Sequence, residues 1–314
     1  MSYSSILKKQ LPLFILPLGI FMVCLIASHF ATSLFFEPSN STMHHLLETI
    51  YTAIAFMIFC LIWFTYKQNS VEVHYLSFGF LLVFLFQVMH IMTFSTSSDY
   101  NLWYYILARL IEISTLILFF IPNIRTLKIT KVKGTAIALI AGSIICLLVY
   151  VNRENLPILY QINGVFSFRF LLEIFILVLV VVCFYFMSHE INQDYFSSDY
   201  IYQAVVLLFF TSLCFILMGK TPVSCFNVLA HLTRVGAYIL LLLGIFGRAV
   251  VYPYERLEEI LNHLPLAIGT FDRNYRLTFG NRRAEEIAGD TCERCLGLSY
   301  RALMKRFNLT GESP

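Results

Sequence analysis

Histidine, arginine and glutamate side chains recur inside long apolar stretches of this chain, at spacings that place them on one helix face. His45 precedes Glu48 by three residues, and Arg169 precedes Glu173 by four. The remaining pairs, all three apart, are Gln87 with His90, Arg109 with Glu112, and His231 with Arg234. Residues three or four apart are neighbours on a helix surface. Imidazole nitrogens bind transition metals or haem, and guanidinium groups bind small polar ligands.

Ionisable groups in apolar surroundings are costly and mark function, so these residues define a candidate ligand-binding site. Its members are His45, Glu48, His90, Trp103, Arg109, Glu112, Glu173, His231 and Arg234. The candidate metal ligands are the three histidines His45, His90 and His231, and haem or a transition metal is the candidate cofactor. The alternative is structural: Arg109 with Glu112, and Arg169 with Glu173, form ion pairs that lock a helix bundle.

The composition shows what kind of element must position these side chains. The chain has 314 residues, of which 58% are hydrophobic and 13% charged, and its mean hydropathy is +0.74. Soluble domains carry about 25% charged residues, so a single large water-soluble core is excluded. Residues 1–250 contain 13 Lys or Arg and 10 Asp or Glu, whereas residues 251–314 contain 9 and 9. We therefore expect a membrane body followed by a soluble tail.

Eight segments are long and apolar enough to cross a bilayer, which takes about 20 residues. They are residues 11–34, 46–66, 75–95, 102–121, 135–151, 168–187, 201–219 and 228–250. The first is too long for a signal peptide and is interpreted as a retained anchor. Tyrosines near the span ends, such as Tyr100, Tyr104 and Tyr105, are expected in the aromatic belt at the membrane interface.

The distribution of basic residues predicts the orientation, because cytoplasmic loops are rich in Lys and Arg. With the N-terminus inside, the inner side holds Lys8, Lys9, Lys67, Arg125, Lys128, Lys131, Lys133 and Arg248. The outer side then holds Arg153, Arg169 and Lys220. An N-in, C-in bundle follows, and it places the polar residues of the spans in the outer half of the membrane, with an almost purely apolar inner half. We expect a pocket that opens outward.

The tail has the pattern of a small α+β domain. An amphipathic helix over residues 254–261 is followed by strands at 267–271 and 275–279, with turn residues at 272–274 between them. Asn281 is placed to cap a helix over 282–288, which Gly289 ends. Cys292 and Cys295 form a lone CxxC with no second pair to complete a zinc site.

Two resemblances follow from these segments. The stretch ILNHLPLAIGTFDRNYRLTFGNRRAEEIAG, with its D-x-x-x-R-x-x-x-x-N core, resembles the opening of a PAS domain, of which the first half is present. The membrane part resembles the third type of membrane-associated sensor (MASE) domain through HHLLETIYTAIAF, HYLSFGFLLVFLFQVMHIMTF, LWYYILARLIEI and LAHLTRVGAYILLLLGIFGRAVVYPYERL. The matching positions are His45, Glu48, His90, Trp103, Arg109, Glu112 and His231. Members of this family usually carry an acidic residue three positions before the His90 equivalent, where this chain has Gln87.

These resemblances imply an all-α polytopic membrane bundle with a truncated, PAS-like cytoplasmic tail. Its parts are a multi-pass sensor domain at 1–250, a connecting signalling helix at 251–262 and a partial PAS domain at 263–314. The implied function is the sensory input module of a bacterial signal-transduction protein, of histidine-kinase or diguanylate-cyclase type, in the cytoplasmic (inner) membrane. The bilayer, a second copy of the chain in a homodimer and a C-terminal output domain beyond this chain are the expected partners, and the dispersed basic residues argue against nucleic acid.

The sequence leaves other functions open. The chain contains no phosphate-binding glycine loop, kinase phosphoacceptor region or cyclase signature, so we expect it to be catalytically inert. A membrane redox protein whose histidines hold haem or a metal is the main alternative. A transporter is less favoured, because the sequence shows no internal repeat and no pair of broken helices.

Overall fold

A computed structural model describes residues 3–35, 41–69, 71–94, 100–121, 129–159, 167–190, 196–218 and 225–306. The chain divides into two compact units, residues 1–249 and 250–314. The long helices of the first unit are α1 (Tyr3–Phe35), α2 (Ser41–Phe64), α3 (Val71–Thr93), α4 (Asn101–Phe120), α5 (Lys131–Val151), α6 (Phe168–Glu190), α7 (Phe196–Leu217) and α8 (Cys225–Phe246). All eight are long and apolar enough to cross a membrane, which confirms the predicted spans.

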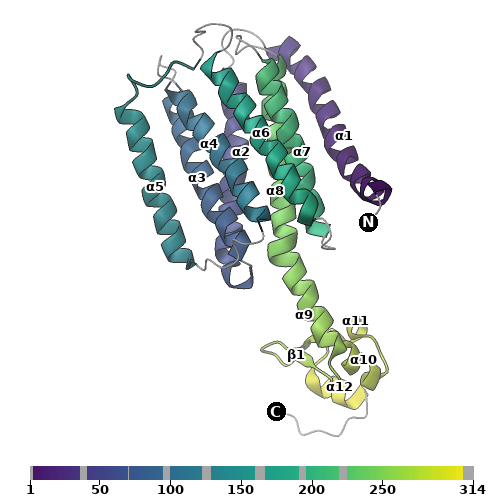
Figure 1. Ribbon diagram of the computed structural model, residues 1–314. Helices are drawn as coiled ribbons and strands as arrows, with labels where there is room; N and C mark the ends of the chain where they lie inside the picture. The colour runs from purple at the N-terminus through teal and green to yellow at the C-terminus, as the bar shows by residue number, and fades with distance from the viewer. Residues whose placement is uncertain are drawn as a thin grey trace. The chain divides into compact units, whose positions relative to one another are not determined.

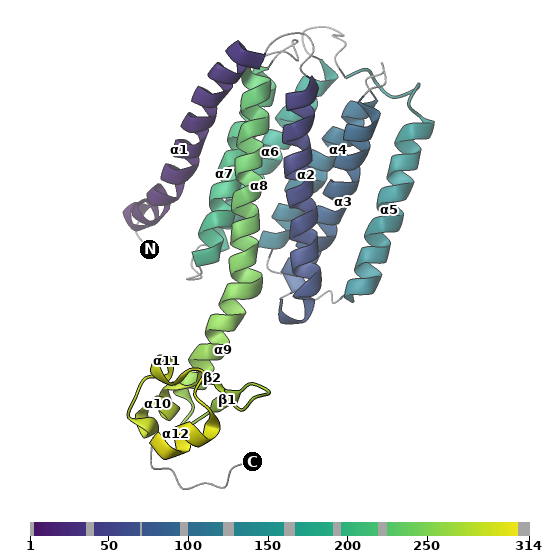
Figure 2. The ribbon, with the colours of Figure 1, turned by 180° about the vertical axis from the view of Figure 1, so that it is seen from behind.

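Six of these helices form a closed ring. Following the contacts around it, α2 packs on α3, α3 on α4, α4 on α6, α6 on α7, α7 on α8, and α8 returns to α2. The helix α1 lies outside this ring against α7 and α8, and α5 lies outside it against α3 and α4. Figures 1 and 2 show α1 and α5 at opposite edges of the bundle. Any side chain that points into the ring is shielded by five other helices.

Burial follows this arrangement. Only 11% of the α1 span and 22% of the α5 span are buried, against 67% for α7. The outer helices expose aliphatic side chains such as Val23 and Ile140, which suit contact with lipid. Between α3 and α4 the approach is closer, because Gly79 lies directly against Thr115. A Cβ at position 79 would lie 2.1 Å from the Thr115 hydroxyl oxygen, so glycine is needed there.

The helical backbone continues past α8. A π-helical segment, Gly247–Val251, leads into α9 (Tyr252–His263), and Pro253 is in the first turn of α9. Because proline has no N–H to donate to the preceding turn, a local change in helical hydrogen bonding directly before it is expected. The predicted amphipathic helix at 254–261 is confirmed, although it is longer than expected and joins the last span without a loop.

The second unit has the predicted order of elements. The strands β1 (Gly269–Phe271) and β2 (Leu277–Gly280) pair antiparallel, followed by α10 (Arg282–Ala288), α11 (Cys292–Cys295) and α12 (Tyr300–Arg306). The side chain of Asn281 caps α10, and Gly289 ends that helix in the left-handed region at φ 67°. Both capping predictions are confirmed.

Candidate functional site

The polar residues of the spans meet inside the ring, all at one end of it. The helices α2, α6 and α8 contribute side chains from their first halves, α4 contributes Arg109 and Glu112 from around its middle, and α3 and α7 contribute side chains from their second halves. The charged or imidazole members with at most 2% exposure are Glu48, His90, Arg109, Glu112, Glu173, His231 and Arg234. Because successive helices alternate in direction, these positions share one half of the bundle. The predicted clustering of these groups is therefore present in the fold.

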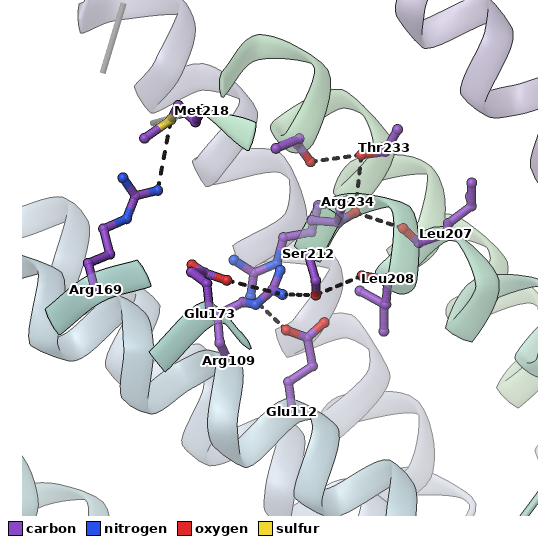
Figure 3. Close-up of polar contacts among 12 residues, drawn as sticks. Arg109, Glu112, Arg169, Glu173, Leu207, Leu208, Ser212, Met218, Thr233 and Arg234 are labelled. Atoms are coloured by element: carbon purple, nitrogen blue, oxygen red, sulfur yellow. Dashed lines mark hydrogen bonds and ion pairs between the residues drawn. The ribbon is translucent and has the colours of Figure 1, made fainter. Parts of the chain in front are cut away.

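Arg234 on α8 is a fully buried cation of the site. Its Nη2 lies 2.9 Å from Glu112 Oε2 on α4 and donates to the Tyr238 hydroxyl at 3.3 Å. The guanidinium carbon lies 4.4 Å from the ring centroid of Tyr51 and 5.5 Å from that of Tyr105. A cation in a bilayer needs such compensation, and here one carboxylate and several aromatic faces supply it. Figure 3 shows the pair between Arg234 and Glu112.

Gln87 on α3 completes the surroundings of Arg234. In the amide orientation that satisfies both side chains, its oxygen accepts from Arg234 Nη1 at 3.2 Å and from Nη2 at 3.1 Å. An acidic residue at this position would add a second negative charge beside Arg234. The neutral amide retains the hydrogen bonds and leaves Glu112 as the carboxylate paired with this arginine.

A second, looser pair lies beside the first. Arg109 on α4 donates to the Ser212 hydroxyl at 2.6 Å and lies 3.9 Å from the Glu173 carboxylate on α6 (Figure 3). Within the described part of the chain, the Nε and Nη1 atoms of Arg109 and both oxygens of Glu173 have no hydrogen-bond partner. Arg169 donates to the Met218 sulfur at 3.8 Å. Arg109 and Glu173 balance each other's charge, but their hydrogen bonding is incomplete among the residues described.

The expected structural ion pair between Arg109 and Glu112 within one helix is wrong. Arg109 pairs with Glu173 rather than Glu112, and Glu112 pairs with Arg234. The reason is the ring itself. Two side chains on one inward face extend side by side towards the centre, where the nearest opposite charge comes from another helix. The ion pairs therefore connect α4 to α6 and α4 to α8.

A separate cluster of imidazoles surrounds Glu48 on α2. Its Oε1 lies 3.4 Å from His44 Nε2 and 3.2 Å from His90 Nε2, and it accepts from the Tyr51 hydroxyl at 3.2 Å. The ring of His231 on α8 lies 4.5 Å from that of His44, centroid to centroid. Glu48 Oε2 and His231 Nδ1 are buried and have no hydrogen-bond partner among the residues described. Glu48 Oε1 thus has three polar neighbours, whereas Oε2 has no hydrogen-bond partner among the residues described.

Both ring nitrogens of His90 have partners. Its Nδ1 lies 2.8 Å from the Asn101 carbonyl oxygen, which only accepts, so Nδ1 donates in this contact. Its Nε2 lies 3.2 Å from Glu48 Oε1. With both ring nitrogens engaged, His90 supports the cluster and is not a free metal ligand.

The residues that can hold a metal differ from the predicted set of His45, His90 and His231. Within the described ranges, one ligand atom each from His44, Glu48 and His231 lie within 4.8 Å of one another. His45 turns its ring to Phe94 instead, at 4.3 Å between centroids. Adjacent residues on a helix point about 100° apart, so of the two histidines only His44 faces His231.

Trp103 and the opposite end of the bundle differ from expectation in other ways. The Trp103 indole N–H donates to the Pro157 carbonyl at 3.1 Å, so this side chain supports the turn before α6. At the other end, buried Glu72 lies 3.2 Å from Arg248, whose guanidinium lies over the Phe119 ring at 4.8 Å. The half expected to be almost purely apolar thus contains an ion pair that is largely buried.

Tyrosines are the functional side chains that sequence reasoning missed. Tyr105, expected in the interfacial belt, is buried between His90 and Phe215, with ring centroids 5.6 and 5.5 Å away. Tyr51 and Tyr238 are fully buried in the same core. The available signal was spacing, because Tyr51 follows Glu48 by three residues and Tyr238 follows Arg234 by four.

Eight membrane-spanning helices, six of them closed around a charged core, define a polytopic membrane protein with a buried polar site at one end of its bundle. Residues 37–253 match the MASE3 family, whose description is membrane-associated sensor domain. The match covers more than half of the chain, and the chain belongs to this family. No curated protein and no solved structure matches it.

Proposed function

We propose that the charged core is the sensory site of an input module in a bacterial signal-transduction protein, and that α8 passes its state to α9. One observation carries the proposal. The same helix that places His231 and Arg234 in the core continues through the π segment into α9 without a loop. A signal that binds two bundle states with different affinity shifts their populations. Any displacement of α8 is then transmitted to α9 through one continuous helical backbone.

Loosely paired charges favour such a two-state core. Arg109 and Glu173 are 3.9 Å apart and lack mutual hydrogen bonds, whereas Arg234 and Glu112 are in close contact at 2.9 Å. Buried charges without complete hydrogen bonding are costly. An alternative packing that completes these bonds, with or without a ligand, would recover part of that cost.

The proposed orientation places the core in the outer half of the membrane and the tail in the cytoplasm of a bacterial cell. Basic residues at the end of the bundle opposite the core support it: Lys67, Lys131, Lys133 and Arg248 are there, while Arg153 is at the core end. Arg125, Lys128 and Lys220, which contributed to the same prediction, lie outside the described residues. Fusions of periplasm-active and cytoplasm-active reporters after residue 156 and after residue 263 test it, and activity of the periplasmic reporter after residue 263 would overturn it.

The tail is proposed to be the opening of a PAS domain that passes the signal to a kinase or cyclase output domain, with the chain acting as a homodimer. Its helix, hairpin and capped helix support this assignment. The chain itself is proposed to be catalytically inert. Turnover of ATP or GTP by the purified protein would contradict that part of the proposal.

The coupling is tested by hydrogen exchange on the full chain in lipid nanodiscs. Glu112→Gln removes the charge that faces Arg234 from α4, so its effect must reach α8 through side-chain contact. We expect faster exchange both in residues 229–238 and in residues 252–263. The matched control is Glu154→Gln in the exposed turn after α5, which should change neither segment. A core variant that alters residues 229–238 and leaves 252–263 at the wild-type rate would refute the coupling.

A membrane redox protein is the second candidate, favoured by the imidazoles around Glu48. An optical spectrum of the purified protein tests it, since haem ligated by imidazole gives an intense absorption band. Such a band, lost in His231→Gln, would support the redox function over the sensory one.

A further inference from the structure

We propose that His44, Glu48 and His231 bind a divalent transition-metal ion of the zinc class, and that this ion is a ligand sensed by the core. The inference rests on the proposed sensory function and specifies its ligand. Two imidazoles and one carboxylate are a donor set that zinc accepts, with a remaining position open to water. Magnesium, which prefers oxygen ligands in an octahedron, fits this set poorly.

The distances suit a small ion. At metal–ligand distances of about 2.0–2.2 Å, tetrahedral ligand atoms lie roughly 3.3–3.6 Å apart. One ligand atom from each of His44, Glu48 and His231 already lies within 4.8 Å of the other two. Side-chain movements of about 1 Å, within the range of small rotations, therefore close the group around an ion.

Unsatisfied atoms point to the same ligand. Glu48 is fully buried and His231 is 2% exposed, yet Glu48 Oε2 and His231 Nδ1 have no hydrogen-bond partner in the described part of the structure. Buried polar atoms without partners are rare and costly. Both atoms carry lone pairs when the residues are in their metal-binding forms, so a cation satisfies both at once.

A second layer of contacts holds the carboxylate in place. The Tyr51 hydroxyl donates to Glu48 Oε1, and His90, itself fixed by the Asn101 carbonyl, approaches the same oxygen. Such contacts orient the ligands of a metal site. Because they converge on Oε1, the opposite oxygen Oε2 remains available to the ion.

Ring geometry and access also fit. The rings of His44 and His231 lie 4.5 Å apart in perpendicular planes. His44 is near the start of α2 and its side chain is 22% exposed, which gives an ion a route to the buried carboxylate. The bound ion would join α2 directly to α8.

The test measures Zn²⁺ binding to the full chain in nanodiscs by competition with a chromophoric chelator, with Co²⁺ absorption as a probe of coordination geometry and Mg²⁺ as the contrasting ion. We expect one Zn²⁺ per chain, a Co²⁺ spectrum typical of imidazole ligation, and no competition by Mg²⁺. His44→Gln, Glu48→Gln and His231→Gln should each weaken binding at least about tenfold, and Tyr51→Phe by roughly tenfold or more.

Two matched controls make the ligand assignment specific. His45→Gln changes the neighbouring imidazole that faces Phe94, and His74→Gln changes an imidazole stacked on Tyr66 near the opposite end of the bundle. Both should bind Zn²⁺ within about twofold of wild type, and the thermal unfolding of every variant shows that it is folded. Absence of Zn²⁺ binding by the wild-type chain, or loss of binding in His45→Gln but not in His44→Gln, would overturn the proposal.

The same samples separate this inference from the proposed function. If Glu112→Gln changes exchange in residues 252–263 but Zn²⁺ does not bind, the metal site is refuted and the sensory coupling stands. If Zn²⁺ binds through the three ligands but neither Zn²⁺ nor Glu112→Gln alters that exchange, the metal site stands and the coupling is refuted.

Discussion

The ion pair between Arg234 and Glu112 yields the most quantitative prediction. Both side chains are fully buried, and the contact at 2.9 Å is the closest ionic contact of Arg234 among the residues described. Glu112→Gln keeps the shape and an acceptor oxygen but removes the negative charge. Gln87 and the tyrosine rings then remain as the only described compensation for a buried guanidinium. Removing one partner of a buried pair costs about 3–5 kcal/mol.

That cost converts into a measurable change in thermal stability. For domains of 150–250 residues, 1 kcal/mol shifts the unfolding temperature by about 2–4 °C. The membrane unit spans residues 1–249, so Glu112→Gln should lower the Tm by roughly 6–20 °C. Unfolding is followed in detergent by circular dichroism with the wild-type chain alongside. Glu154→Gln, which removes the acid of a pair whose Glu154 is 84% exposed, should cost less than about 1 kcal/mol.

A double variant tests the reasoning behind this number. Arg234→Met alone leaves Glu112 buried without its cation and should be destabilising to a similar extent. In the double variant both charges are gone, so it should be no less stable than either single variant. If the losses of the two single variants simply add in the double variant, the side chains do not stabilise each other and the argument fails. A Tm for Glu112→Gln within about 2 °C of that for Glu154→Gln would refute it as well.

Three further predictions concern packing, the tail and thiol chemistry. Gly79→Ala places a Cβ 2.1 Å from Thr115 and should cost about 1–3 kcal/mol of stability, measured as a lower Tm. The control Gly19→Ala adds a Cβ with nothing within 4 Å and should have no such effect. Asn281→Ala removes four hydrogen bonds of a fully buried side chain. This loss should cost about 2 kcal/mol of stability and make proteolysis of the tail roughly 30-fold faster. An unchanged rate of proteolysis would contradict the capping role. Burial raises the pKa of the Cys292 thiol. Its alkylation should therefore be slower than that of a free thiol at about pH 8, and the rate should still increase above about pH 9. An alkylation rate that levels off near about pH 8.5 would contradict this prediction.

The sequence predicted which residues belong to the site but not which partner each one takes. Eight spans follow from hydropathy, and the alternation of helix direction places His90 at the same end as Glu48. Neither property depends on how the helices are arranged around the ring. The pairing of Arg109 with Glu173 does depend on it, because it requires α4 to pack against α6. Loop lengths and spacings along one helix carry no such information.

The choice between His44 and His45 failed for a related reason. Both precede Glu48 at a spacing that shares its helix face, at four and three residues respectively. Only the position of α8 decides between them, since His231 lies against the ring of His44. A difference of one residue rotates a side chain by about 100°, so a helix-face argument from a single helix cannot resolve two adjacent candidates.

One side chain joins the arginine pair to the imidazole cluster. Tyr51 donates its hydroxyl hydrogen to Glu48 at 3.2 Å, and its ring lies under Arg234 at 4.4 Å. Arg234 follows His231 by three residues and therefore lies about one helical turn further along α8. A change of charge at Glu48, whether from a bound cation or a gained proton, alters the acceptor to which Tyr51 donates and hence the aromatic face that Arg234 contacts. On the proposed function, both clusters therefore act on the same turn of α8, and a signal read at either reaches that helix without any rearrangement of the outer helices.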